Sequence, residues 1–371
     1  MNVFIKIIKW IVGLLFIFSG AVKTIDPIGF SLKLDEYFTI FNMPVLTEYS
    51  LELSVFLTIF EVLLGVLLIL GIKKVFTLVS LILMMIFFTF LTFYSAYFEV
   101  VQDCGCFGDA IKLSPWGSFA KDVILLILLI ILWSGRKYID LFFARPIGTY
   151  VSIVSVLIMG YIAFMGIYHL PIKDFRPYAV GKNIPEGMKT AEELGLEPPQ
   201  YEIRYNLRNN LNGQKIQLSE SEYIGNKSYW QKGTSWDLID TEEKLINKGY
   251  EPPIHDFNIE CSDNGDMTYY YLDLPQLVLI ITPIPSETTI KGMNKVSEFA
   301  ENVQQLDIPI LSVASDNVVI GNLETCLMDA TTLKTMMRGN PGIMFLQSGT
   351  IKAKYHWRDA PKSDEIQKIF E

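Results

Sequence analysis

The chain of 371 residues is 50% hydrophobic and has a net charge of −9, with its lysine and arginine residues sparsely distributed. This charge pattern excludes nucleic-acid binding as a function class. Four cysteines are too few for a disulfide scaffold and lack zinc-site spacing, so no metal site is predicted. Apolar residues crowd the first 170 positions, whereas the sequence after Pro171 is typical of an acidic soluble domain.

Five apolar segments are long enough to cross the hydrocarbon core of a bilayer. They comprise residues 3–22, 51–70, 75–97, 119–133 and 150–168. The first segment lacks a small-x-small cleavage site, so we interpret it as an uncleaved anchor. The lipid bilayer is therefore the first predicted partner of the chain.

The basic residues beside these segments predict the orientation of the chain. With five spans they fall on one side, which the positive-inside rule makes cytoplasmic. They are Lys6, Lys9, Lys73, Lys74, Arg136, Lys137 and Arg145. We expect a bacterial inner-membrane protein whose N-terminus is cytoplasmic and whose C-terminal domain is extracytoplasmic. All four cysteines then face the compartment in which disulfides persist.

Ionisable residues in or near the spans indicate a polar pocket. Glu61 lies inside the second span, where a carboxyl group is costly unless it is paired, so it is a functional candidate. Lys23 ends the first span on the outer side and can reach inward. We expect Lys23, Glu61, Asp103 and Asp109 to support a site beneath the outer surface. Lys121 and Asp122 begin the fourth span on the same side, where with Asp26 they can join a polar layer just under the outer surface. The Lys121 side chain itself is interpreted as one that extends to the membrane interface.

The motif Asp103-Cys104-Gly105-Cys106-Phe107-Gly108-Asp109 lies between the third and fourth spans. Two neighbouring thiols can attack and resolve a disulfide, and Gly105 lets the backbone bend between them. A bond between residues two apart closes a very small ring, which makes a weak and easily reduced link. Cys104 and Cys106 are thus candidate catalytic residues. The alternative is a packed turn, and the flanking aspartates disfavour thiolates.

A family resemblance rests on this loop and on the first span. Phe18-Ser19-Gly20, Lys23 and Asp26-Pro27 resemble the first-span signature of the DoxX and MauE membrane families, and the cysteine loop is similar to the MauE-type loop. Residues at similar positions are Tyr37, Pro44, Glu61, Gly65 and Gly71. The resemblance covers residues 1–143.

The resemblance implies an antiparallel bundle of four membrane helices, shaped like vitamin K epoxide reductase, to which the fifth span is a connection. It also implies a supporting role in thiol redox or disulfide maturation outside the cytoplasm. Vitamin K epoxide reductase proteins carry a further Cys-x-x-Cys in a membrane helix, which this chain lacks. A quinone is therefore suggested only by fold analogy, and no other cofactor is predicted.

The C-terminal half begins with an irregular segment and continues with alternating strands and helices. Residues 201–205 and 215–218 alternate in polarity around Asn212-Gly213, which predicts a β-hairpin. Further on, the patterns predict strands at 276–282 and 308–314, helices at 290–306 and 331–337, and a hairpin of 342–347 with 350–357.

This order of elements resembles a thioredoxin fold over residues 253–371, with Pro341 at the position of its cis-proline. An active thioredoxin has Cys-x-x-Cys after the first core strand, where this chain reads Thr282-Pro283-Ile284-Pro285-Ser286. We therefore expect an α/β thioredoxin-like domain without the usual chemistry. Cys261 and Cys326 are interpreted as structural cysteines, with the alternative that one of them is a secondary thiol that exchanges with Cys104 or Cys106.

These observations divide the chain into a membrane bundle (1–145), a fifth span (146–170), an irregular segment with a hairpin (171–253) and a thioredoxin-like domain (254–371). The predicted function is an accessory role in extracytoplasmic thiol redox, with chemistry like that of a thiol–disulfide oxidoreductase. Its partner would be another envelope protein. The alternative function is a non-catalytic membrane anchor or assembly factor.

Overall fold

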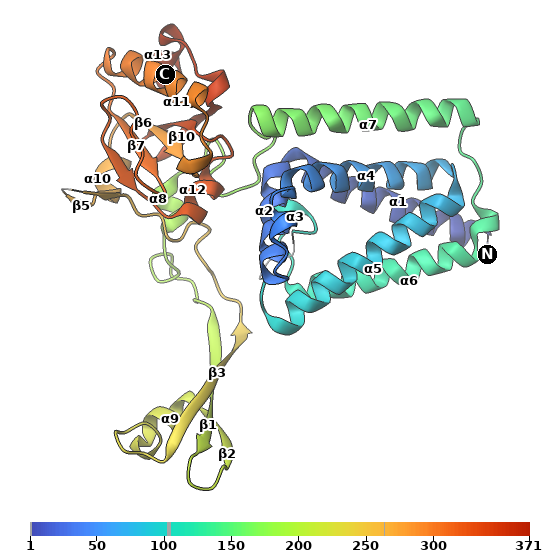
Figure 1. Cartoon of the computed structure of the whole chain (residues 1–371), viewed down its shortest axis with the longest axis horizontal. Helices are drawn as coiled ribbons and strands as arrows, with labels where there is room; N and C mark the ends of the chain where they lie inside the picture. The colour runs from blue at the N-terminus through green and yellow to red at the C-terminus, as the bar shows by residue number, and fades with distance from the viewer. Residues whose placement is uncertain (1, 102–104, 263) are drawn as a thin grey trace. The chain divides into compact units, whose positions relative to one another are not determined.

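A computed structural model describes residues 2–101, 105–262 and 264–371 (Figure 1). The chain forms two compact units. The first comprises Met1–Lys182 together with Asn258–Glu371, and the second comprises Asn183–Phe257. Membrane helices and a large sheet belong to the first unit, and a small sheet belongs to the second.

Five helices of the first unit are long and apolar enough to cross a membrane, which confirms the five predicted spans among the described residues. They are α1 (Asn2–Ile25), α4 (Ser50–Leu70), α5 (Lys74–Phe98), α6 (Pro115–Ser134) and α7 (Arg145–Tyr168). Local signals set their ends. Ser114 caps α6 by accepting a hydrogen bond from the Gly117 backbone N–H at 3.2 Å, and Pro115 occupies the first turn. Gly71 ends α4 in the left-handed conformation.

Helices α1, α4, α5 and α6 pack through a shared apolar core. Helix α1 lies on α4, α5 lies on α6, and α7 lies on α4 (Figure 1). A Cβ atom on Gly65 would lie 2.8 Å from the Gly13 carbonyl oxygen and 2.9 Å from Ile17 Cγ1, so glycine permits the close contact of α1 with α4. Large apolar side chains cover the outer surface of these helices, as lipid contact requires, and they include Leu14, Phe56, Leu83, Ile127 and Leu157.

Two further helices, which were not predicted from the sequence, lie between the first and second spans. Helix α2 (Pro27–Ile40) begins where the Asp26 carboxylate accepts a hydrogen bond from the Gly29 backbone N–H at 2.9 Å. Helix α3 (Pro44–Thr47) follows it. Helix α2 has a mixed sequence with a weak apolar periodicity, so the pattern alone did not reveal it.

The C-terminal part of the first unit is a seven-stranded sheet of order β10-β9-β6-β7-β8-β4-β5. Strands β6, β7 and β8 are parallel, and β9 pairs antiparallel with β6 and with β10. The strands are β4 (Glu260–Cys261), β5 (Gly265–Asp266), β6 (Leu277–Thr282), β7 (Ile310–Ala314), β8 (Thr325–Leu327), β9 (Gly342–Gln347) and β10 (Thr350–His356). Four helices accompany them: α10 (Thr268–Leu272), α11 (Ile290–Gln304), α12 (Ala330–Met336) and α13 (Ser363–Phe370).

The centre of this sheet is β6, an uninterrupted apolar run that is buried along its whole length. Such a strand needs cover on both faces. Helices α11 and α13 cover the face that carries Val278 and Ile280, and Phe345 of β9 joins the same core. The predicted helices and strands of this region coincide with the observed ones within a few residues. The Asn340–Pro341 peptide bond is cis.

The second unit is a three-stranded antiparallel sheet of order β2-β1-β3, formed by β1 (Gln200–Asn209), β2 (Lys215–Ser219) and β3 (Trp236–Asn247), with helices α8 (Ile184–Met188) and α9 (Glu220–Gly225). Strands β1 and β2 are the two segments in which the sequence predicts a hairpin. Strand β3 was not predicted, because its acidic residues are of a type depleted in strands. Residues 171–182 belong instead to the first unit, where Gly181 and Lys182 exchange backbone hydrogen bonds with Ile351.

Candidate functional site

The membrane bundle contains a cavity of about 290 Å³. Helices α1, α2, α4, α5 and α6 contribute to its wall, together with the Cys106 loop, by which we mean residues 105–110. Most of the lining is aliphatic or aromatic, and Phe16, Phe30, Tyr37, Phe88 and Phe107 supply the rings. The polar lining residues are Ser19, Lys23, Lys33, Glu61, Thr92, Cys106, Lys121 and Asp122. Polar groups thus meet in an apolar surrounding, in which their interactions with one another are strong.

Lys23 and Glu61 form a buried ion pair in the wall of the cavity. The Nζ atom of Lys23, in the last turn of α1, lies 2.5 Å from Oε2 of Glu61 in α4, and the two side chains are 3% and 6% exposed. The same ammonium group lies over the rings of Phe30 and Phe88, 5.1 and 5.2 Å from their centroids. Burial of either charge alone would be costly, so each residue compensates the buried charge of its partner.

A second ion pair lies next to the Cys106 loop. Lys121 Nζ is 2.8 Å from Asp122 Oδ1, and the Thr92 hydroxyl donates a hydrogen bond to Asp122 Oδ2 at 3.0 Å. The Lys121 ammonium group lies 4.9 Å from the centroid of the Phe107 ring, and it interacts with the Cys106 side chain through its charge and a hydrogen bond. Lys121 was predicted to extend to the membrane interface, and in the structure its ammonium group has partners on the cavity wall.

The backbone of the Cys106 loop is held against α1. The Ser19 hydroxyl donates a hydrogen bond to the Cys106 carbonyl oxygen at 2.8 Å, and the Gly108 backbone N–H donates one to the Gly105 carbonyl oxygen at 3.0 Å. Gly105 has a φ of +63°, a conformation that side chains disfavour. Cys106 is half-buried and faces the cavity. Cys104 and Asp103 lie outside the described residues.

Asp109, the fourth residue predicted to support the pocket, lies next to Arg338. Its carboxylate does not line the cavity but lies 3.3 Å from Nη2 of Arg338, which follows α12. Burial raises the pKa of Asp109, the Arg338 guanidinium opposes this effect, and the Asp26 carboxylate adds to it. The predicted pocket residues therefore divide into two groups, with Lys23 and Glu61 in the cavity wall and Asp109 at Arg338.

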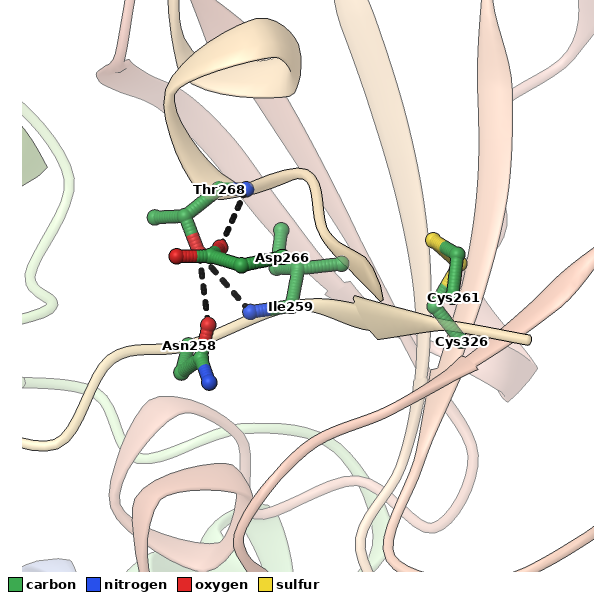
Figure 2. The surroundings of a disulfide bond; sticks show 6 residues. All are labelled: Asn258, Ile259, Cys261, Asp266, Thr268 and Cys326. Atoms are coloured by element: carbon green, nitrogen blue, oxygen red, sulfur yellow. Dashed lines mark hydrogen bonds between the residues drawn. A yellow bond between two sulfur atoms is a disulfide. The ribbon is translucent and has the colours of Figure 1, made fainter. Parts of the chain in front are cut away.

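Cys261 and Cys326 form a disulfide bond between β4 and β8 (Figure 2). A small hydrogen-bonded turn supports β4. The Thr268 hydroxyl donates to Asn258 Oδ1 at 3.1 Å and accepts from the Ile259 backbone N–H at 2.9 Å, as Figure 2 shows. Glu324 lies within 4.8 Å of both sulfurs. Because the sulfurs are bonded to each other, this group does not offer the two thiolates that a metal site would need.

Thr92 and Tyr37 are polar residues of the cavity wall that the sequence did not single out. Thr92 and Asp122 are joined by a hydrogen bond across α5 and α6, and the hydroxyl oxygen of Tyr37 lies 2.9 Å from that of Ser95. A polar side chain inside an apolar span is a signal that could have identified Thr92. Tyr37 lies on α2, whose helical nature was not predicted, so its place in the wall could not be inferred.

Comparison with known proteins identifies the membrane half. Residues 1–135 match the family described as methylamine utilisation protein MauE, which confirms the predicted resemblance to that family. The matched range contains α1 to α6, and with them the whole wall of the cavity and the Cys106 loop. No curated protein and no solved structure matches the chain.

Proposed function

We propose that this chain, whose residues 1–135 form a MauE-family membrane domain, assists thiol redox chemistry outside the cytoplasm by exchanging a disulfide with another envelope protein. One observation carries the proposal. Cys106 faces the cavity, and the ammonium group of Lys121 interacts with its side chain. A neighbouring cation favours the thiolate, which is the form of cysteine that attacks a disulfide.

The exchange reaction conserves atoms and electrons. One thiolate of Cys104 and Cys106 attacks a disulfide of the partner, which forms a mixed disulfide and releases one thiolate of the partner. The second cysteine then attacks the mixed disulfide and releases the other partner thiolate. The two cysteines have been oxidised to a disulfide, and the partner's disulfide has been reduced to two thiols. The reverse sequence would oxidise a partner instead.

Each of the two ion pairs in the cavity wall combines one positive and one negative side chain. The pair of Lys23 with Glu61 is neutral as a whole, and so is the pair of Lys121 with Asp122. Each therefore places hydrogen-bonding groups beside the cavity without leaving a net charge in the membrane domain. We assign Lys121 the role of stabilising the Cys106 thiolate, and Lys23 and Glu61 the role of maintaining the cavity.

We further propose that the sheet-rich C-terminal domain is a thioredoxin-like module that binds a partner without thiol chemistry of its own. The parallel strands β6 and β7 beside the antiparallel hairpin β9–β10 support this assignment. The segment after β6 carries no cysteine, and the two cysteines of the domain are bonded to each other. Their disulfide is assigned a structural role.

The proposed topology places the N-terminus in the cytoplasm and the C-terminal domain outside a bacterial inner membrane. The basic residues at the ends of α1, α5 and α6 support it. In intact spheroplasts, an impermeant maleimide should label a cysteine introduced at exposed Lys368, and should not label one introduced at Lys137. The opposite labelling would overturn the topology.

A non-catalytic anchor is the second candidate function, favoured by the absence of a cysteine pair after β6. Alkylation of Cys104 and Cys106 in intact cells, before and after reduction, separates the two functions. Redox exchange predicts that a fraction of the pair resists alkylation until it is reduced, and that Cys104→Ser with Cys106→Ser abolishes the mixed disulfides trapped by acid quenching. Two cysteines that stay fully alkylatable under oxidising conditions would refute the redox function.

A further inference from the structure

Arg338 joins the sheet-rich C-terminal domain to two carboxylates of the membrane domain. Its Nε atom donates to Asp26 Oδ2 at 2.8 Å and to Asp26 Oδ1 at 3.1 Å, and Nη2 donates to Asp109 Oδ2 at 3.3 Å. Nη1 donates to the Lys334 carbonyl oxygen of α12 at 2.5 Å. The Arg338 side chain is only 6% exposed. A planar guanidinium is well suited to hold two carboxylates in a fixed geometry.

The two carboxylates belong to segments that form the wall of the cavity. Asp26 caps α2, and this helix contributes Phe30 and Tyr37 to the lining. Asp109 lies three residues after Cys106, in the same loop. Arg338 therefore contacts the start of one wall element and the end of another, although it does not line the cavity itself.

The position of the Cys106 loop depends on the charge of Arg338, because this loop carries one of two neighbouring carboxylates. Asp26 and Asp109 are close enough to interact through their charges, and like charges repel. Arg338 compensates both of them. Without Arg338, two partly buried carboxylates would face each other without a compensating cation. A displacement of the loop away from Asp26 would relieve their repulsion, and it would also change the position of Cys106 relative to Lys121.

We infer that Arg338 is a positioning residue through which the C-terminal domain holds the Cys106 loop against the cavity and so sets the redox equilibrium of Cys104 and Cys106. The inference rests on the proposed function, because it assigns a regulator to that same site. As a consequence, a partner protein that binds the C-terminal domain and moves Arg338 would change the redox equilibrium of the cysteine pair through the ion pairs of Arg338 with Asp26 and Asp109.

The test uses the full chain in lipid vesicles, equilibrated with mixtures of reduced and oxidised glutathione. The reaction is balanced, since two protein thiols and one oxidised glutathione give one protein disulfide and two reduced glutathiones. In Arg338→Gln, loss of the Lys121 contact should make the thiolate form less favourable. We expect the equilibrium to shift about tenfold toward the Cys104–Cys106 disulfide, which is about 30 mV for a two-electron couple.

Matched variants separate positioning from general docking of the domain. Arg358→Gln removes another arginine of the same domain, which donates to the Tyr168 carbonyl oxygen at the end of α7 at 3.3 Å, and it should leave the equilibrium unchanged. Asp109→Asn should reproduce part of the shift, and Arg338→Lys should restore part of the wild-type value. Resistance to protease shows which variants remain folded.

Two results would overturn the inference. The first is that folded Arg338→Gln and folded Asp109→Asn have the same thiol–disulfide equilibrium as the wild type. The second is that Arg358→Gln shifts this equilibrium as much as Arg338→Gln does. Failure of the proposed function is distinguishable, because the pair would then form no disulfide in any glutathione mixture. In that case the rate of Cys106 alkylation in a Cys104→Ser background still decides whether Arg338 positions the loop. A rate that differs between Arg338→Gln and Arg358→Gln would uphold positioning, and equal rates would refute it.

Discussion

The Nζ atom of Lys23 and the Oε2 atom of Glu61 lie 2.5 Å apart inside the membrane domain, and neither side chain is more than 6% exposed. Removal of one partner from a buried pair leaves an uncompensated charge. We therefore expect Lys23→Met to lower the free energy of unfolding by about 3–5 kcal/mol. Denaturation of the detergent-solubilised protein measures the effect.

A more solvent-exposed ion pair of the same domain provides the control for this prediction. Lys33 and Glu36 lie 3.1 Å apart in α2, and their side chains are 30% and 47% exposed. Lys33→Met should cost no more than about 1 kcal/mol, because solvent screens this pair. The double variant Lys23→Met with Glu61→Leu should be less destabilised than Lys23→Met alone. Equal effects of Lys23→Met and Lys33→Met would contradict the importance of the buried pair.

Lys121 should control the reactivity of Cys106. We expect Lys121→Gln to slow alkylation of Cys106 by about tenfold at neutral pH, since one pKa unit corresponds to about 1.4 kcal/mol of differential stabilisation. The measurement is the rate of iodoacetamide modification in a Cys104→Ser background. Lys112→Gln is the control, because Lys112 is an exposed lysine near the same loop. Equal rates in the two lysine variants would show that Lys121 does not stabilise the thiolate.

The Cys261–Cys326 disulfide should stabilise the C-terminal domain. The two cysteines are 65 residues apart, and in the chain-entropy model such a loop corresponds to roughly 4 kcal/mol. Cys261→Ala with Cys326→Ala is expected to lower the thermal midpoint of unfolding of this domain, and reduction of the wild-type protein should have the same effect. The glutathione equilibrium of Cys104 and Cys106 should stay the same in this variant. A changed equilibrium would indicate that the two cysteine pairs exchange.

Acid should destabilise the segment that follows the fifth span. The Asp174 carboxylate lies 2.8 Å from Arg176 Nε and 2.7 Å from Lys354 Nζ. Burial alone would raise the pKa of Asp174, but the charges of Arg176 and Lys354 lower it from 3.8 to about 2. A carboxyl group whose pKa is lowered by folding contributes stability above its unfolded pKa and loses that contribution as the pH falls through the folded pKa.

We therefore expect the wild-type protein to lose about 2 kcal/mol more than Asp174→Asn between pH 4 and pH 2, the window between the unfolded and folded pKa values. Urea denaturation of both proteins at a series of pH values measures the difference. Subtraction of the variant's profile removes the contributions of all other carboxyl groups. Parallel profiles would show that the ions around Asp174 add no stability.

The elements that the sequence predicted well are those with a strong local pattern. Spans appear as apolar runs of the length that a bilayer requires, and β6 appears as a short buried run before an amphipathic helix. Helix α2 and strand β3 were missed, because their local patterns are weak and their partners elsewhere in the chain stabilise them. The partner of Glu61 could be proposed as Lys23 only in outline, since the sequence places them 38 positions apart.

The membrane spans and the MauE-like first half can be recognised from the sequence alone, because hydrophobic length and a short motif are local properties of the chain. The surroundings of Cys106, in contrast, follow from the three-dimensional fold. Lys121 interacts with its side chain, and Asp109 in the same loop is held by Arg338 from more than two hundred positions away. The interaction energy of two charged groups depends on their distance in space and on their burial, and neither can be read from their order in the chain.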